Sequence, residues 1–279
     1  MPSDELRMGV LNALIALSDY TAEFDVAAER AARILVSGPV GTAGFDYTNA
    51  LDIARRFPTL LLRGEDHSSR LRQLVCEWIK CLRPSWGPLI PNGRNYLSAY
   101  LSRNEKQCFE TAGLFDSPIT DQIHQWWTDI ALFYRSVRAN ELEAVGRIGE
   151  ERTMRYETDR LVQLGRPDLV PTWMSVEDNT LGYDVRSYKV SQEGVSPLNI
   201  EVKSTRFLPV SFFLTKNEWK RASSAPDLHI FYVWYLPQDR LIEIRPDQLR
   251  PSIPVDIGGG NWESARFICD AVFEAANVR

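Results

Sequence analysis

The sequence predicts an α/β (α+β) protein, with a helical N-terminal domain followed by a mixed β-sheet flanked by helices. Apolar residues of the first half recur at steps of three and four, which is the period of amphipathic helices. The second half carries short strand-like runs separated by helical segments. One of these runs, Leu228–Leu236, is apolar on both parities, a pattern typical of a strand that is covered on both faces.

Helical periodicity extends across the middle of the chain. A helix is expected to begin at Ser117-Pro118, because serine is a frequent N-cap and proline fits the first helical turn. A second, long helix is expected from about Glu141 to Leu164, ending just before Gly165, where a C-terminal glycine belongs. Strands are expected only after this helix, so we place a boundary near residue 140, between domains 1–139 and 140–279.

Beyond the long helix the sequence predicts strands with two further helices. One helix is expected at about Thr215–Ser223, and a last helix is expected after Gly258–Gly260, with Asn261 as its N-cap. The expected strands are Thr172–Val176, Leu181–Val190, Leu198–Ser204, Leu228–Leu236 and Leu241–Ile244.

Composition narrows the class of protein. Of the chain's 279 residues, 44% are hydrophobic and 25% charged, with 16 Gly and 16 Pro, and these proportions exclude collagen-like and wholly disordered proteins. The formal net charge is -5. This charge argues against bulk electrostatic binding of nucleic acid, but not against an enzyme that acts on DNA through a local site and bound cations. Apolar runs are too short for a membrane span, and the start of the chain lacks the pattern of a signal peptide. The four cysteines show no metal-like spacing, so a reduced, cytoplasmic protein is expected.

The residues that carry chemistry lie on two neighbouring strands. Side chains of a strand alternate between faces, so Glu201 and Lys203 point the same way. The turn-rich segment 191–197 predicts an antiparallel hairpin, and folding it about Gln192–Glu193 places Asp184 near Glu201. Two facing carboxylates repel each other unless a cation lies between them. A divalent cation beside Lys203 meets that need, since hard ions such as Mg²⁺ take oxygen ligands.

Glu150 extends this set from the preceding helix. Met154, Glu157, Leu161 and Leu164 follow Glu150 by four, seven, eleven and fourteen residues, so all five side chains share one face of the helix. An acid at the end of a face that packs on the sheet is able to point into a site at the sheet edge. The sequence identifies no clear residue that completes a metal shell after Lys203. Glu218 or Lys216 could reach the site from the next helix, although a structural role is favoured for both.

The order of these elements resembles the PD-(D/E)XK, restriction-endonuclease-like nucleases, with Asp184 and Glu201-Val202-Lys203 at the motif positions. More narrowly, residues 141–246 are similar to the domain at the C-terminus of the plant NO VEIN protein. The fragments that carry this similarity are Ile148-Gly149-Glu150-Glu151, Gly182-Tyr183-Asp184-Val185-Arg186-Ser187, Ile200-Glu201-Val202-Lys203-Ser204-Thr205 and Phe213-Leu214-Thr215-Lys216-Asn217-Glu218-Trp219. Tyr183 stands where the namesake motif has proline.

The resemblance implies a metal-dependent endonuclease that hydrolyses phosphodiester bonds. The proteins in which such domains occur suggest a role in bacterial restriction or in antiphage, antiviral defence. Asp184 and Glu201 would bind Mg²⁺ or Mn²⁺, with the carbonyl of Val202. Glu150 would complete the shell or hold a second ion. Lys203 would orient or help deprotonate the attacking water; because it lies beside carboxylates, its pKa is expected to be raised, which favours the orienting role.

DNA is the expected partner, although these residues do not separate DNA from RNA. Domain 1–139 would recognise the target or bind a protein partner, and a homodimer is one expected form, because double-strand cutting usually takes two sites. The alternative is a catalytically silent nuclease-fold module that recruits a protein or nucleic-acid partner.

Overall fold

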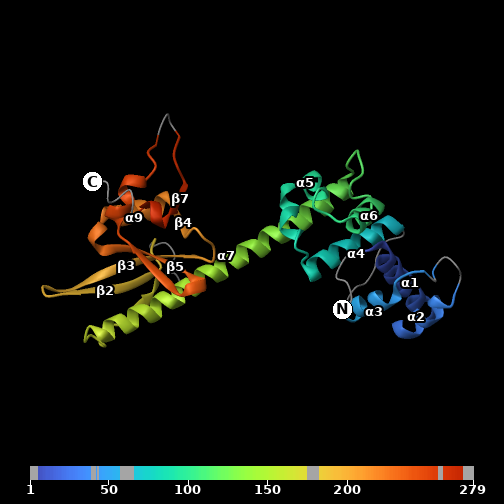
Figure 1. Ribbon diagram of the computed structural model, residues 1–279, viewed down its shortest axis with the longest axis horizontal. Helices are drawn as coiled ribbons and strands as arrows, with labels where there is room; N and C mark the ends of the chain where they lie inside the picture. The colour runs from blue at the N-terminus through green and yellow to red at the C-terminus, as the bar shows by residue number, and fades with distance from the viewer. Residues whose placement is uncertain are drawn as a thin grey trace. The chain divides into compact units, whose positions relative to one another are not determined.

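The computed structural model describes residues 6–38, 42, 44–56, 66–174, 182–256 and 260–272 (Figure 1). The chain divides into two compact units, Met1–Arg138 and Ala139–Arg279. Within the described ranges, every helix is either too short or too polar to cross a membrane. The α/β class expected from the sequence is confirmed, since helices flank a mixed five-stranded sheet.

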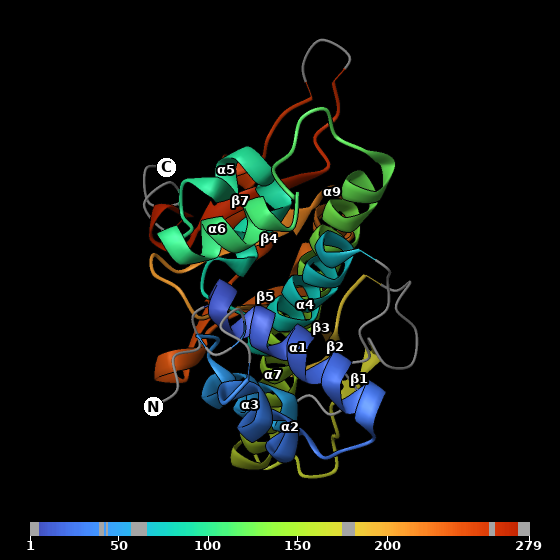
Figure 2. The ribbon, with the colours of Figure 1, turned by 90° about the vertical axis from the view of Figure 1, so that its right-hand side faces the viewer.

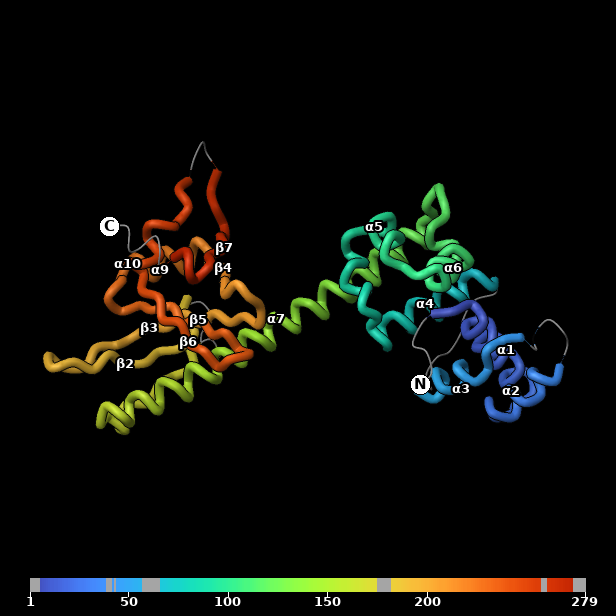
Figure 3. The backbone as a smooth tube through the Cα atoms, viewed as in Figure 1, coloured from blue at the N-terminus to red at the C-terminus, as the bar shows by residue number. Residues whose placement is uncertain are grey.

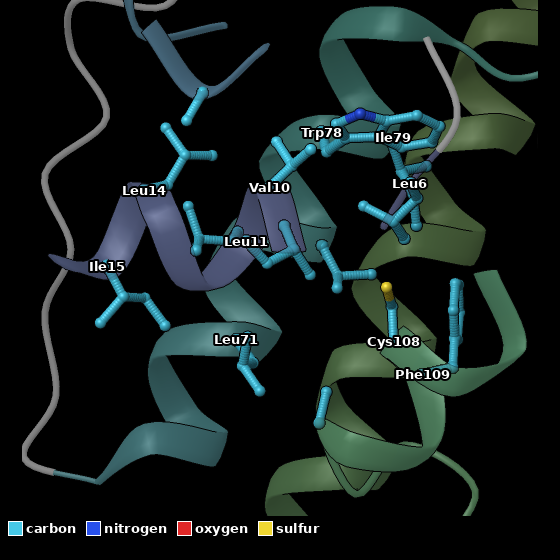
Figure 4. Packing of buried hydrophobic residues seen from close by; sticks show 14 of the residues in the cluster. Leu6, Val10, Leu11, Leu14, Ile15, Leu71, Trp78, Ile79, Cys108 and Phe109 are labelled. Carbon is cyan, nitrogen blue, oxygen red and sulfur yellow. The ribbon is translucent and has the colours of Figure 1, made fainter. Parts of the chain in front are cut away.

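The first unit is helical, and its core gathers apolar side chains from α1, α4 and α6. Leu11 of α1, Leu71 of α4 and Phe109 of α6 are all fully buried there (Figure 4). Helix α1 also contacts α2 and α3 (Figure 2). The helices are α1 Met8–Phe24, α2 Ala28–Val36, α3 Tyr47–Arg56, α4 His67–Leu82, η1 Gly87–Asn92, α5 Arg94–Ser98, α6 Arg103–Thr111 and the first part of α7 Asp121–Gln163.

Two neighbouring tryptophans of α7 anchor it in this core. The indole N–H of Trp126 donates to the carbonyl of Arg72 at 3.0 Å, and that of Trp127 donates to the carbonyl of Leu114 at 2.9 Å. Both rings also pack against Phe109. The pair therefore stabilises the helical unit, as most tryptophans on an apolar helix face do.

Helix α7 corrects the expectation of two separate helices. It is one helix of 43 residues, Asp121–Gln163, and it begins at Asp121 rather than at Ser117-Pro118. Neither glycine nor proline stands near residue 140, where the two were expected to divide, so nothing in the sequence stops the helix there. Its end agrees with the expectation: Gly165 adopts φ +73°, and its N–H donates to the carbonyl of Val162 at 2.9 Å.

The second unit is built on a mixed sheet of order β1-β2-β3-β5-β6. β2 and β3 form an antiparallel hairpin (Figure 3), β3 and β5 are parallel, and β5 and β6 are antiparallel. The strands are β1 Thr172–Trp173, β2 Val185–Ser191, β3 Gly194–Thr205, β5 His229–Tyr235 and β6 Arg240–Ile244; α9 Lys216–Ser224, η2 Pro226–Leu228, η3 Leu236–Gln238, α10 Pro246–Leu249 and η4 Arg250–Ser252 connect or follow them.

A second, two-stranded sheet precedes the last helix. β4 Ser211–Thr215, which was not expected, pairs antiparallel with β7 Ser264–Ile268. The helix expected after Gly258–Gly260, with Asn261 as its N-cap, begins later than predicted: residues 264–268 form β7, whose buried Phe267 stacks on Phe212 at 5.6 Å between ring centroids, and helical residues follow at 269–272. Of the expected strands, Leu181 and residues 175–176 lie outside the described residues.

Each face of the main sheet packs on a different layer. Ile200 and Val202 of β3 join Tyr232 and Trp234 of β5 in a core beneath α7. On the opposite face, Phe231 and other residues of β5 pack with the second sheet and with α9. Because strand side chains alternate, the acidic and basic residues of β3 at 201 and 203 lie on the face away from α7.

Gly149 lets α7 approach the sheet closely. A Cβ at this position would lie 1.8 Å from Oγ of Ser204 and 3.3 Å from Cγ1 of Val202. Three residues earlier in the same helix, a Cβ at Gly146 would meet nothing within 4 Å. Close packing against β3 therefore requires a glycine at position 149 but not at position 146.

We predict that Gly149→Ala lowers the free energy of unfolding by about 1 kcal/mol, because the new Cβ displaces the hydroxyl of Ser204 and presses on Cβ of Ser204 at 3.2 Å and Cγ1 of Val202 at 3.3 Å, which outweighs the better helix propensity of alanine. The matched control Gly146→Ala should raise it by up to about 1 kcal/mol. Urea unfolding followed by circular dichroism measures both. Equal stabilisation by the two substitutions would mean that α7 does not lie this close to β3.

Glu157 fixes α7 to the sheet through a buried polar network. Its carboxylate is fully buried and accepts hydrogen bonds from Arg160 at 2.9 and 2.6 Å, from the hydroxyl of Tyr232 at 2.8 Å and from the hydroxyl of Ser187. One turn earlier, the buried hydroxyl of Thr153 accepts from the indole of Trp234 at 2.9 Å. These bonds satisfy a charge whose burial would otherwise be costly.

Glu157→Ala is expected to lower the stability of the protein by about 3 kcal/mol, because it leaves Ser187, Tyr232 and Arg160 without their shared acceptor. Asp159→Ala, on an exposed position of the same helix, should change stability by less than about 0.5 kcal/mol. Thermal and urea unfolding of both variants test this. A small loss for Glu157→Ala would show that the network adds little net stability.

Candidate active site

The β2–β3 hairpin places Asp184 beside Glu201. Its register runs from Ser191↔Gly194 to Val185↔Ile200, and the same count continues to Asp184 and Glu201. The backbone N–H of Asp184 donates to the carbonyl of Ile200 at 3.0 Å. One carboxylate oxygen of Asp184 accepts from the backbone N–H of Val202 at 2.7 Å. Asp184 therefore stands just before β2 begins, and its side chain accepts a hydrogen bond from the backbone of β3.

Val202 offers a further oxygen at this edge. In a strand, the N–H and the C=O of one residue face the same side. Because the N–H of Val202 faces Asp184, its carbonyl faces the edge on which Asp184 lies.

Lys203 joins two carboxylates on the face away from α7. Its Nζ lies 2.7 Å from Oε1 of Glu201 and 3.0 Å from Oε1 of Glu218. Glu201 is only 7% exposed, and the side chains of Lys203 and Glu218 are 18% and 20% exposed. The strand supplies an acid and a base two residues apart, and α9 supplies the second acid.

A capping box at the start of α9 orients the carboxylate of Glu218. The hydroxyl of Thr215 accepts from the backbone N–H of Glu218 at 3.2 Å, and Oε2 of Glu218 accepts from the backbone N–H of Thr215 at 2.9 Å. One carboxylate oxygen therefore caps the helix, while the other contacts Lys203.

Burial makes both carboxylates of the hairpin reluctant to ionise. It raises the pKa of Asp184 to about 6; the nearby charge of Glu150 adds to the shift, while the N–H of Val202 opposes it. Burial also raises the pKa of Glu201 well above its ordinary value, against the opposing charge of Lys203. A bound cation would favour the ionised form of both groups.

The lysine behaves in the opposite way. Burial by itself would lower the pKa of Lys203, but the charges of Glu201 and Glu218 outweigh it, and the pKa is raised above its ordinary value. Burial acts to raise the pKa of Glu218, yet Lys203 and the N–H of Thr215 hold it below the usual range. Lys203 is therefore a fixed positive charge, as expected from its carboxylate neighbours.

Glu150 approaches the cluster from α7. The indole N–H of Trp173 in β1 donates to one of its carboxylate oxygens, and its charge contributes to the raised pKa of Asp184. The structure thus brings Glu150 close to Asp184 and holds it through Trp173, rather than through the ion pairs of Lys203.

The donor set fits a hard divalent cation in part. Among the residues that the structure describes, no three His, Cys, Asp or Glu side chains stand in an arrangement that would hold a metal ion by themselves. Mg²⁺, however, is often bound by one or two carboxylates, with water and substrate phosphate as the other ligands. Asp184, which is half-buried, and Glu201, which is buried, match that description, because a cation would stabilise the ionised form of each carboxylate.

The sequence raised Glu218 as a residue that could reach the site and favoured a structural role for it; the structure places it beside Lys203. The signal was the spacing Thr215-x-x-Glu218, a capping box that fixes where the helix begins and hence where Glu218 lies. Lys216, the other residue considered there, instead contacts Asp256 at 2.5 Å and Asn261 at 3.0 Å. It belongs to a separate polar contact.

Comparison with known proteins supports the relevance of this segment. No curated protein and no solved structure matches the chain. Residues 149–244 match a family model described as "Protein NO VEIN, C-terminal", a family linked to the restriction-endonuclease-like fold. The matched segment contains Glu150, Asp184, Glu201, Lys203 and Glu218. Over this segment the chain is similar to a family compatible with a nuclease-like module.

Proposed function

We propose that the C-terminal unit is a metal-dependent nuclease that hydrolyses phosphodiester bonds, with DNA as its substrate. The single observation that carries this proposal is the meeting of Asp184, Glu201 and Lys203 at the end of one hairpin. A buried and a half-buried carboxylate beside a fixed ammonium suit a reaction in which a cation is held and negative charge develops on a phosphate.

The residues divide the work as follows. Asp184 and Glu201 would hold Mg²⁺ or Mn²⁺, with the carbonyl of Val202 and the carboxylate of Glu150 next to them. When bound, such an ion lowers the pKa of a water molecule and polarises the phosphate. Lys203 would donate hydrogen bonds to the attacking water or to a phosphate oxygen and offset its charge. Its raised pKa argues against service as a base.

A catalytically silent binding module is the second candidate. One observation favours it: Nζ of Lys203 is already engaged by both Glu201 and Glu218. In such a module this ion-pair cluster would stabilise the fold, and residues 1–139 would bind a protein partner. Cleavage assays separate the two candidates.

We predict cleavage of plasmid or single-stranded DNA in Mg²⁺ or Mn²⁺ and none in EDTA. Asp184→Asn, Glu201→Gln and Lys203→Ala should each reduce the rate by roughly 10²-fold or more. The first two retain the shape of the side chain and remove a charge that burial disfavours, so both should fold. Asp159→Asn, an exposed carboxylate of α7, is the matched control and should cut at the wild-type rate.

Several outcomes would redirect this proposal. Cutting that survives all three substitutions would locate catalysis elsewhere or reveal a contaminant. An inactive wild type that co-purifies with a partner through residues 1–139 would favour the binding module. Parallel reactions with RNA decide between the two nucleic acids, and mass measurement in solution decides whether the protein acts as a homodimer.

Glu218 is proposed as a positioning residue for Lys203. Glu218→Gln should retain the cap on α9 and weaken the ion pair, and should lower kcat by about 10-fold with little change in KM. Thr215→Ala removes the other half of the capping box and should reduce stability by about 1 kcal/mol without this loss of kcat. Steady-state kinetics and urea unfolding of both variants test it. Equal kinetics for the two variants would assign Glu218 to the helix cap alone.

A further inference from the structure

A cavity of about 440 Å³ opens at one end of the five-stranded sheet, within the second unit. Four strands contribute to its wall, through Lys189 of β2, Leu198 of β3, Tyr232 of β5 and Glu243 of β6. Neighbouring strands lie about 4.8 Å apart, so the cavity crosses about 14 Å of the sheet. We call it the strand-end cavity.

Part of its wall is apolar. Leu198, Ile230 and Pro226 line it, together with the ring of Tyr232. Tyr232 is 2% exposed and its hydroxyl donates to Glu157, so it forms the floor of the cavity, and Leu198, Ile230 and Pro226 supply the apolar surface that a ligand would contact. Such a wall suits a flat, largely apolar group.

The charges on the wall are not all neutralised. Arg160 pairs with the buried Glu157 at 2.6 Å, and Arg245 pairs with Asp247 at 3.2 Å. Lys189 and Arg250 are exposed and form no ion pair with any residue in the described ranges. Two cations therefore remain for a ligand.

Besides Asp247, two further acids line the wall together with His229. Glu243 accepts a hydrogen bond from the hydroxyl of Tyr156 at 3.1 Å. The carboxylate of Asp227 has no partner within the part of the chain that the structure describes, so it is able to accept hydrogen bonds from hydroxyl or amino groups of a ligand.

We propose that the strand-end cavity binds a nucleoside phosphate. The base would lie on the apolar wall, the phosphate would meet Lys189 or Arg250, and Asp227 would accept from a sugar hydroxyl or an exocyclic amine. The volume is in the range of small-ligand sites. A free nucleotide and one nucleotide of a nucleic-acid strand share this chemistry, and the experiment distinguishes these sources.

This cavity is separate from the candidate active site. Leu198 packs in the core beneath α7, whereas Glu201 and Lys203 lie on the opposite face of β3. Binding at the cavity therefore does not depend on the proposed hydrolysis, and a chelator leaves it intact.

Isothermal titration calorimetry of the full chain in EDTA tests the proposal with four probes: AMP, adenosine, inorganic phosphate and a single-stranded oligodeoxynucleotide. AMP or the oligonucleotide should bind, and adenosine and phosphate alone should bind at least about 10-fold more weakly. The double substitution Lys189→Gln with Arg250→Gln should weaken binding by about 10-fold or more. Arg155→Gln, an exposed arginine of α7 outside the cavity, should not.

Each result decides something. Binding of AMP assigns the cavity to a free nucleotide, and binding of the oligonucleotide alone assigns it to a strand. Affinity that the double substitution leaves unchanged would overturn the proposal, as would the absence of binding by AMP and oligonucleotide at millimolar concentration. Phosphate that binds as tightly as AMP would reduce the site to an anion contact and overturn the role of the base. Circular dichroism checks that both variants fold.

Discussion

The candidate site depends on one ammonium group shared by two carboxylates. Nζ of Lys203 lies between Glu201 of its own strand and Glu218 of α9, so this contact links the sheet to the helix that packs on it. Without a positive charge, the buried Glu201 and the half-buried Glu218 would repel each other and favour their neutral forms. The lysine therefore keeps both carboxylates close together and links β3 to α9.

Local patterns were sufficient to predict the hairpin. The turn at Gln192–Glu193 sets the register, and a two-residue period then fixes that Asp184 meets Glu201 and that Lys203 shares its face. The sequence also predicted the central strand, because residues Leu228–Leu236 are apolar at both odd and even positions. The structure confirms it: β5 lies between β3 and β6. These features depend on a few adjacent residues.

Features that depend on distant partners were not predicted. Glu218 contacts Lys203 because α9 folds back on the sheet, which no local pattern reveals. The continuity of α7 is a local feature that was also not predicted: neither glycine nor proline near residue 140 interrupts the helix. The segment 264–268 forms a strand because β4 offers it an edge and Phe212 a partner for Phe267. Residues 264–268 are only five and of mixed polarity, so their sequence pattern is too short to predict a strand or its pairing with β4.

The inner face of α7 carries Gly149, Thr153 and Glu157 at intervals of four, and each meets the sheet in a different way: close approach, a single hydrogen bond and a shared acceptor. One residue added or removed between them would turn everything beyond it by about 100°. Glu157 would then leave its buried donors, and Glu150 would lose its fixed relation to them. Homologues of this unit should therefore show substitutions but no insertions or deletions between the positions of Gly149 and Glu157.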